Sequence, residues 1–188
     1  MVLGVQENKT ILIDMDDVMT DLLTPWVEYL NDKHDLSVYT SDITAWDMSL
    51  FFPTLSKEEI YQPLDEEDFW KTVKPHEGAV YYLNKLCNEY QVYIVTATSL
   101  NNIKYKVDHI IKPYFPFINP RNIIVSNNKQ MISGDVLIDD NINNLLSGKY
   151  DKILFSRPHN YTYLSKDYPI VIADGWEDCY KKIHKILS

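Results

Sequence analysis

The stretch Lys9-Thr-Ile-Leu-Ile-Asp-Met-Asp-Asp-Val-Met-Thr-Asp21 decides the fold. Its apolar run, residues 11–13, is typical of a buried parallel strand, and acidic residues follow where that strand ends. Because open α/β sheets bind ligands at the carboxyl ends of their strands, Asp14 is predicted to lie at a site. Packed carboxylates repel one another unless a positive charge compensates them, and a divalent ion such as Mg²⁺ is the simplest compensation. The alternative is a strand followed by a solvated acidic loop.

The composition indicates one globular core with room for a small second lobe. The chain has 188 residues and 45% hydrophobic content. Its formal net charge of −9 argues against binding polymeric nucleic acid or an anionic membrane, but it does not exclude a small phosphorylated substrate. We see no membrane span and no secretory signal, and Cys87 and Cys179 form no CxxC pattern. These features predict a cytoplasmic location with reduced thiols.

A block of short helices follows the first strand. The first helix is predicted to have Thr24 as its N-cap and Pro25 at its first helical position. Strand alternation is absent over residues 37–74, where Ser56-Lys-Glu-Glu59 is a capping-box pattern and large aromatics are dense. We therefore predict a small helical cap, residues 21–74, inserted into a core of residues 1–20 and 75–188.

Strands and helices alternate after Pro75, which predicts an α/β fold with a Rossmann-like, mainly parallel sheet flanked by helices. The strands are expected at residues 10–14, 92–95, 123–125, 136–138, 152–155 and 170–172. The helices are expected at residues 76–90, 101–111, closed by Pro113 and Pro116, 142–146 and 176–187.

Four of these strands end in, or run on to, polar residues: Asp14, Thr96, Lys129 and Asp139. A parallel sheet brings such ends to one edge. An aspartate there can act as a nucleophile and form an acyl phosphate, while a second carboxylate such as Asp16 can protonate a leaving oxygen and then activate water. A hydroxyl and a lysine can hold and neutralise phosphoryl oxygens, and a metal bound by Asp14 and Asp139 would bridge carboxylate and phosphate. This set predicts phosphoryl transfer.

The segments Asp14-Met-Asp-Asp-Val18, Thr96 after Val-Tyr-Ile-Val, Lys129, and Leu137-Ile-Asp-Asp140 resemble, in order, the four motifs of the haloacid dehalogenase-like superfamily. Within it the chain is most similar to the 5′(3′)-deoxyribonucleotidases, over nearly its whole length. Further segments carry this similarity: Phe69-Trp70 with Lys74-Pro-His-Glu-Gly-Ala-Val80, Asn128-Lys129 leading to Asp135-Val-Leu-Ile-Asp-Asp140, Ile153-Leu-Phe155 with His159-Asn160, and Asp174-Gly-Trp-Glu177.

The resemblance implies a magnesium-dependent phosphomonoesterase that acts on deoxyribonucleoside monophosphates through an aspartyl-phosphate, with an aromatic cap over the base. Asp14 is then the nucleophile and Asp16 the acid/base, while Thr96 and Lys129 bind the phosphate. Asp14, Asp139 and the backbone carbonyl of Asp16 are the implied magnesium ligands. Asp140 is either a further ligand or a residue that orients Lys129 or a metal-bound water.

Three positions depart from the family pattern. Asp17 stands where glycine is usual, and Leu22 stands where family members often have a phenylalanine near the base. Ala97, counted here with the phosphate-binding residues, stands where some members have serine. The first departure adds negative charge beside the site, and the other two bear on substrate preference.

Candidate contacts to the base or sugar are Asp21, Leu22, Trp46, Phe69 and Trp70. Asp21 alternatively caps the first helix, and the aromatics alternatively form the core of the cap. Extra positive charge near the phosphate is offered by Lys104, Lys106 and Arg157, although surface lysines are usually solvated. None of the five histidines has ligand spacing, and none is predicted to be catalytic.

Two other functions remain open from the sequence. The same chemistry serves a different substrate, such as a sugar phosphate or a 3′-phosphate on DNA, or the fold serves as a non-catalytic nucleotide-binding module. The expected partner is a small-molecule nucleotide, without polymeric nucleic acid or membrane. The sequence leaves a homodimer, the base preference, and the choice between 5′- and 3′-phosphates open.

Overall fold

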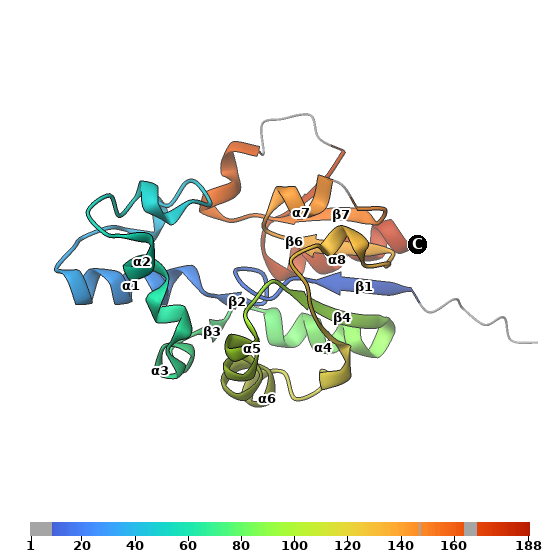
Figure 1. Ribbon diagram of the computed structural model, residues 1–188. Helices are drawn as coiled ribbons and strands as arrows, with labels where there is room; N and C mark the ends of the chain where they lie inside the picture. Colours follow the sequence, from blue (N-terminus) through green and yellow to red (C-terminus); the bar gives the residue numbers. More distant parts are fainter. Residues whose placement is uncertain (1–8, 147, 164–168) are drawn as a thin grey trace, which may run out of the picture.

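A single sheet of six parallel strands forms the centre of the computed structural model, which describes residues 9–146, 148–163 and 169–188. The strand order is β5-β4-β1-β6-β7-β8 (Figure 1). The strands are β1 (Thr10–Ile13), β4 (Gln91–Thr96), β5 (Ile123–Val125), β6 (Val136–Asp139), β7 (Asp151–Phe155) and β8 (Val171–Ala173). Every pairing between them is parallel, which confirms the predicted α/β fold.

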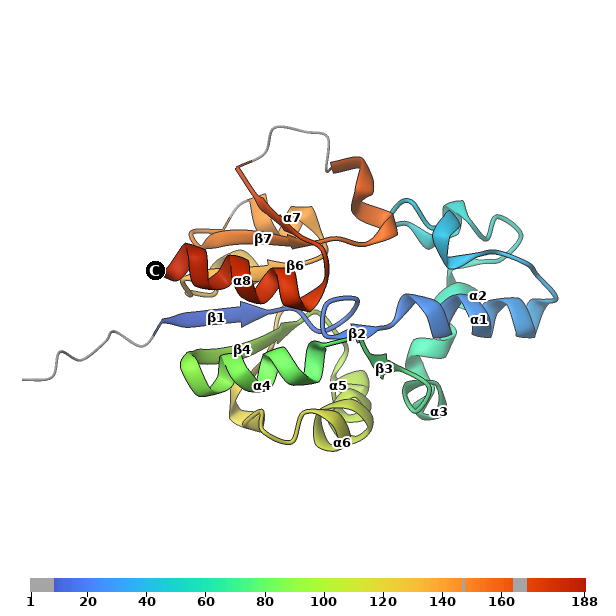
Figure 2. The ribbon, with the colours of Figure 1, turned by 180° about the vertical axis from the view of Figure 1, so that it is seen from behind.

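Helices cover both faces of this sheet, which explains the uninterrupted apolar run in β1. Ile11 and Ile13 belong to the core beneath α4 (Ala79–Glu89) and α8 (Gly175–Leu187), which lie in front of the sheet in Figure 2. Leu12 points to the opposite face, into a smaller cluster with Leu145 of α7 (Ile142–Leu146). Among the described residues, no helix has both the length and the apolar character that crossing a membrane requires.

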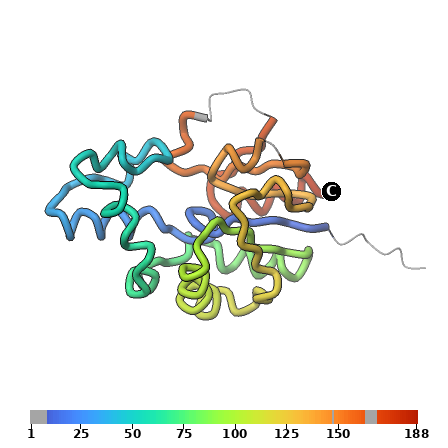
Figure 3. The backbone as a smooth tube through the Cα atoms, in the orientation of Figure 1, coloured from blue at the N-terminus to red at the C-terminus, as the bar shows by residue number. Residues whose placement is uncertain are grey.

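A lobe of short helices extends from one end of the sheet, between the two-residue strands β2 (Thr20–Asp21) and β3 (Lys74–Pro75) (Figures 1 and 3). It contains α1 (Leu23–His34), α2 (Lys57–Tyr61) and α3 (Glu67–Trp70), linked by 3-10 turns. The antiparallel β2–β3 ribbon closes its base. The division of the chain into core and cap, with a cap of residues 21–74, remains a prediction.

Helix α1 begins at Leu23, two residues earlier than an N-cap at Thr24 would allow, so that prediction is wrong. The backbone N–H of Leu23 donates to Oδ1 of Asp17 at 3.1 Å, and that of Thr24 donates to Oδ1 of Asp21 at 3.2 Å. Two carboxylates that precede the helix, one from the loop after β1 and one from β2, therefore satisfy two of the free N–H groups of the first turn. Thr24 itself lies inside the helix.

Two other helix boundaries differ from the prediction. Helix α4 starts at Ala79 rather than at residue 76, because the N–H of His76 donates to Met19 O at 2.9 Å and extends the ribbon. The helix expected to close at Pro113 continues past it: α5 (Leu100–Lys106) runs through a π-helical turn, Val107–Ile111, into a short helix over 112–114. Pro113 lies just after the π-helical turn, where the hydrogen-bond ladder of the helix already changes, so the helix continues past a residue that lacks an N–H.

Trp176 of α8 holds the loop that follows β1. Its side chain is buried, and its indole Nε1 donates to the carbonyl oxygen of Val18 at 2.9 Å. Its ring also packs against Phe155, at 5.6 Å between ring centroids. The last helix of the chain thus fixes the loop that carries Asp14, Asp16 and Asp17.

Replacing Trp176 with phenylalanine should lower the free energy of unfolding by about 2–4 kcal/mol, because the Val18 carbonyl loses its donor and the smaller ring leaves a void. Urea denaturation measures this change. Tyr81→Phe, at an exposed position on α4, is the matched control and should shift stability by less than about 0.5 kcal/mol. Equal unfolding midpoints for Trp176→Phe and the wild type would contradict the assignment.

Candidate active site

Lys129 joins the ends of the two central strands β1 and β6. Asp14 follows β1, and Asp139 ends β6. The Lys129 ammonium, 2% exposed, pairs with Oδ1 of Asp14 and with Oδ2 of Asp139, the latter at 2.7 Å. Burial alone would lower the pKa of Lys129, but the two carboxylates raise it above its usual value. The structure thus brings three of the predicted site residues together as a buried ionic cluster.

Asp140 adds a third buried carboxylate to this cluster. Its Oδ2 lies 2.7 Å from Nε2 of His159, and its Oδ1 has no hydrogen-bond partner among the described residues. Burial raises the pKa of Asp140 well above its usual range, and the neighbouring Asp139 raises it further. Burial likewise raises the pKa of Asp14, against the opposing effect of Lys129. Negative charge here therefore exceeds what the lysine balances.

These carboxylates fit a hard cation. One oxygen each from Asp14, Asp139 and Asp140 lie within 4.8 Å of one another. An all-oxygen donor set, a buried oxygen without a partner and surplus negative charge are what Mg²⁺ or Ca²⁺ requires of a site.

Asp16 and Thr96 meet through a second buried lysine. Lys106 Nζ lies 2.5 Å from Oδ2 of Asp16 and donates to Oγ1 of Thr96 at 3.1 Å. The alternative of a solvated side chain is therefore wrong for Lys106, which is 1% exposed. It holds for Lys104, which pairs with Asp108 on the surface.

The backbone at Asp17 explains why glycine is usual there. Asp17 has a φ of 56°, in the left-handed region that glycine adopts without strain and that aspartate tolerates better than most residues. Its carboxylate caps α1, and Arg157 lies 4.0 Å from its Oδ1. Burial, and then the nearby Asp140, raise the pKa of Asp17 to about 7, against the effect of Arg157. Arg157 also pairs with Asp21 at 3.6 Å. Asp21 therefore has two contacts: it caps α1 through the N–H of Thr24 and forms an ion pair with Arg157.

A cavity of about 220 Å³ opens beside Asp16 between the sheet and the helical lobe. Leu22 and Trp46, two of the predicted base contacts, line it, as do Ala97 and His159. The other lining residues are mainly apolar side chains of the lobe, among them Trp26, Ile43, Met48 and Tyr61. Trp46, 54% exposed, packs edge-on against His159 with 4.8 Å between ring centroids.

Phe69 and Trp70 lie elsewhere, and neither is among the described residues that line the cavity. Both are buried in the lobe, with 5.7 Å between their ring centroids, and the Trp70 indole donates to Leu64 O at 2.8 Å. Trp26 and Tyr61 line the cavity instead, which the sequence did not indicate because all four are aromatics on helices of the same predicted cap.

His159 and Asn160 are functional candidates to which the sequence analysis gave no role, although it quoted them among the segments that carry the family similarity. Burial lowers the pKa of His159 to about 4, so at neutral pH an uncharged imidazole faces Asp140 and can donate its Nε2–H. Asn160 Nδ2 donates to the carbonyl oxygens of Asp140 and Phe155, both at 2.8 Å. Their signal was their place just after β7, beyond the four motifs that guided the prediction.

A parallel sheet with Asp14, Thr96, Lys129 and Asp139 at or beyond its strand ends defines the haloacid dehalogenase-like class of hydrolases. A haloacid dehalogenase family hydrolase from Deinococcus radiodurans R1, solved with bound phosphate and sodium, has this fold. The two structures superpose with a TM-score of 0.65 at 11% identity, over 95% of this chain and 96% of that one.

The chain belongs to the family of 5′ nucleotidase, deoxy (pyrimidine), cytosolic type C proteins, whose profile matches residues 8–187. It is 34% identical to the 5′(3′)-deoxyribonucleotidase of Bacillus subtilis (strain 168), over 93% of this chain and 98% of that protein. It is 35% identical to the 5′(3′)-deoxyribonucleotidase of Clostridium acetobutylicum, over 80% of this chain and 83% of that protein. Membership of this family confirms the predicted enzyme class, a phosphatase.

Asn160→Asp should lower the free energy of unfolding by about 2–5 kcal/mol, because it replaces an amide donor with a carboxylate that faces two carbonyl oxygens. Urea denaturation of the variant beside Asn84→Asp, at an exposed position of α4, measures the effect. If the two variants lose the same stability, Asn160 does not hold the ends of β6 and β7.

Proposed function

We propose that this enzyme is a magnesium-dependent phosphomonoesterase that hydrolyses deoxyribonucleoside 5′- or 3′-monophosphates through an aspartyl-phosphate. The observation that carries the proposal is the buried Asp14–Lys129–Asp139 cluster beside an apolar, aromatic-lined cavity. The names of the relatives, 5′(3′)-deoxyribonucleotidases, support the substrate class.

Asp14, Asp139 and Asp140, with the backbone carbonyl of Asp16, would hold the magnesium ion. When bound, the ion would neutralise charge on the phosphoryl group and on the carboxylates that surround it. Lys129 spends two of its three N–H donors on Asp14 and Asp139, so the third can serve a phosphoryl oxygen. Thr96 Oγ1 accepts from Lys106, which leaves its own hydrogen for another phosphoryl oxygen.

In the first step, a carboxylate oxygen of Asp14 attacks phosphorus and the bond from phosphorus to the nucleoside oxygen breaks. Asp16 gives its proton to that leaving oxygen. In the second step, water attacks phosphorus and passes a proton to Asp16. The bond to Asp14 then breaks, inorganic phosphate leaves, and both aspartates return to their starting forms.

The cavity would take the base. Leu22, Trp26 and Trp46 offer apolar and aromatic surface of the kind that packs against a planar ring. A sugar phosphate would leave its hydroxyl groups against this apolar lining without partners, so the cavity favours nucleotides. The formal net charge of −9 disfavours a phosphate on DNA. The free thiols of Cys87 and Cys179 accord with a cytoplasmic site of action.

Steady-state release of phosphate from a panel of nucleoside monophosphates and sugar phosphates tests the substrate. Deoxyribonucleoside monophosphates should be the best substrates, and Asp14→Asn should reduce kcat by more than about 10⁴-fold, as loss of a nucleophile does. The circular dichroism spectrum of the variant should match that of the wild type. No turnover of any deoxynucleotide would sink the proposal, and a profile peaking on sugar phosphates would favour a different phosphatase.

Magnesium should raise the thermal midpoint of the wild type, by an amount equivalent to about 2.7 kcal/mol at a hundred times its dissociation constant. EDTA should stop turnover. Asp139→Asn should abolish both the thermal shift and the activity, whereas Asp151→Asn, at an exposed carboxylate on β7, should retain both. A shift that survives Asp139→Asn would place the ion elsewhere.

A further inference from the structure

Lys106 is a buried cation at the boundary between the sheet and the helical lobe. Its side chain reaches from the end of α5 to Asp16 and Thr96, and it is 1% exposed. A buried ammonium is costly unless its surroundings compensate it. Here the compensation is the Asp16 carboxylate at 2.5 Å, the Thr96 hydroxyl at 3.1 Å and the Trp70 ring, whose centroid lies 5.1 Å from Nζ.

We infer that Lys106 is the positioning residue for the acid/base Asp16, with the ring of Trp70 keeping the ammonium in place. The inference rests on the proposed function and deepens it. Lys106 holds Oδ2 of Asp16, whereas Oδ1 has no partner among the described residues. Oδ1 is therefore the oxygen left to exchange a proton with the leaving group and with water.

The donors of Lys106 argue against a phosphate-binding role. An ammonium has three N–H donors, and Lys106 spends one on Asp16 and one on Thr96. The Trp70 ring covers a further side of the ammonium. Lys129 also spends two donors, on Asp14 and Asp139, but no aromatic ring is found against its ammonium among the described contacts, so its third donor is left for a phosphoryl oxygen. The two lysines thus have separate tasks, with Lys129 on the phosphoryl group and Lys106 on the acid/base.

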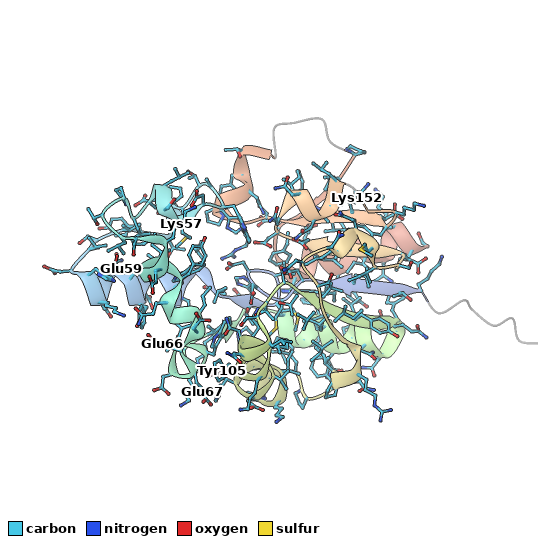
Figure 4. The ribbon with its side chains drawn as sticks, in the orientation of Figure 1. Lys57, Glu59, Glu66, Glu67, Tyr105 and Lys152 are labelled. Atoms are coloured by element: carbon cyan, nitrogen blue, oxygen red, sulfur yellow. The ribbon has the colours of Figure 1, made fainter. Side chains whose placement is uncertain are left out.

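Packing between α3 and α5 fixes where Lys106 lies. Trp70 ends α3 of the lobe, and α3 packs against α5 of the core. Glu67 and Tyr105, one from each helix, are labelled at this contact in Figure 4. Oε1 of Glu67 also lies 2.8 Å from Nε2 of His109, which belongs to the π-helical turn that follows α5. The π-helical turn directly after Lys106 is of a kind frequent at functional sites.

Positioning of this kind has a kinetic signature. A misplacement of about 1 Å can cost a catalytic group about 10²-fold in rate. A nucleoside is a poor leaving group that needs the proton of Asp16, whereas p-nitrophenolate leaves without protonation. The constant kcat/KM covers the steps up to departure of the leaving group. A misplaced Asp16 should therefore lower kcat/KM for the nucleotide and leave kcat/KM for p-nitrophenyl phosphate nearly unchanged.

The experiment compares kcat/KM of Lys106→Met with a deoxyribonucleoside monophosphate and with p-nitrophenyl phosphate. We expect a loss of about 10- to 100-fold with the nucleotide, up to the lower end of the roughly 10²- to 10⁴-fold that acid–base catalysis contributes, because Asp16 is misplaced but still present. With the aryl phosphate we expect a loss of less than about 3-fold. Asp16→Asn should show the same split, and the double variant should be no worse than Asp16→Asn alone. Lys112→Met, a surface lysine paired with Asp108, is the matched control and should behave as the wild type.

Equal losses with both substrates, together with weaker inhibition by inorganic phosphate, would overturn the inference, since they would place Lys106 on the phosphoryl group. If the loss of kcat/KM in the double variant equals the product of the losses in Lys106→Met and Asp16→Asn, the two residues act independently, and this too would overturn the inference. If Lys106→Met does not fold, Lys106→Arg serves in its place. It keeps the positive charge but replaces the compact ammonium with a planar guanidinium, so kcat/KM should again fall more with the nucleotide than with the aryl phosphate. A wild type without nucleotide turnover defeats the proposed function instead, whereas an active wild type with an unimpaired Lys106 variant defeats only this inference.

Discussion

The ion pairs of Lys129 with Asp14 and Asp139 are the constraint on which the rest of the site depends. Strand order makes β1 and β6 neighbours, so their carboxylates end side by side in a buried position. Without a cation between them, two such groups would repel each other and one would take up a proton. A lysine carried beyond the end of β5 removes that conflict. The fold therefore brings reactive groups together and also supplies the charge that lets them stay together.

The same principle extends outward from this cluster. Lys106 balances Asp16, and Arg157 lies between Asp17 and Asp21. Asp140 instead meets a neutral histidine, and its second oxygen is unpaired among the described residues. The charge left uncompensated is thus concentrated where the strand ends meet. That location suits a divalent cation and a phosphoryl group better than it suits a closed hydrophobic core.

Local patterns predicted the strands and their polar ends, because an apolar run followed by aspartate is visible within a few residues of Asp14 and Asp139. Contacts between distant elements were not visible. A lysine on an amphipathic helix has the same local pattern whether it is solvated, as Lys104 is, or buried, as Lys106 is. The two-residue β2–β3 ribbon has no periodicity to detect. Trp26, which lines the cavity, and Trp70, which is not among the residues that line it, are both aromatics on helices of the predicted cap, and only packing separates them.

Two tryptophans of the lobe, Trp46 and Trp70, connect it to two different parts of the site. Trp46 packs against His159, which bonds to Asp140, and Trp70 covers Lys106, which bonds to Asp16. Each aromatic ring thus contacts a group that in turn orients a site carboxylate. Among the described contacts, Trp46 is the one aromatic ring of the lobe against His159, and Trp70 is the one against Lys106. Displacing the lobe would remove both rings and so disturb both carboxylates at once. The lobe is therefore part of the arrangement that sets the carboxylates, and it does more than enclose the cavity beside them.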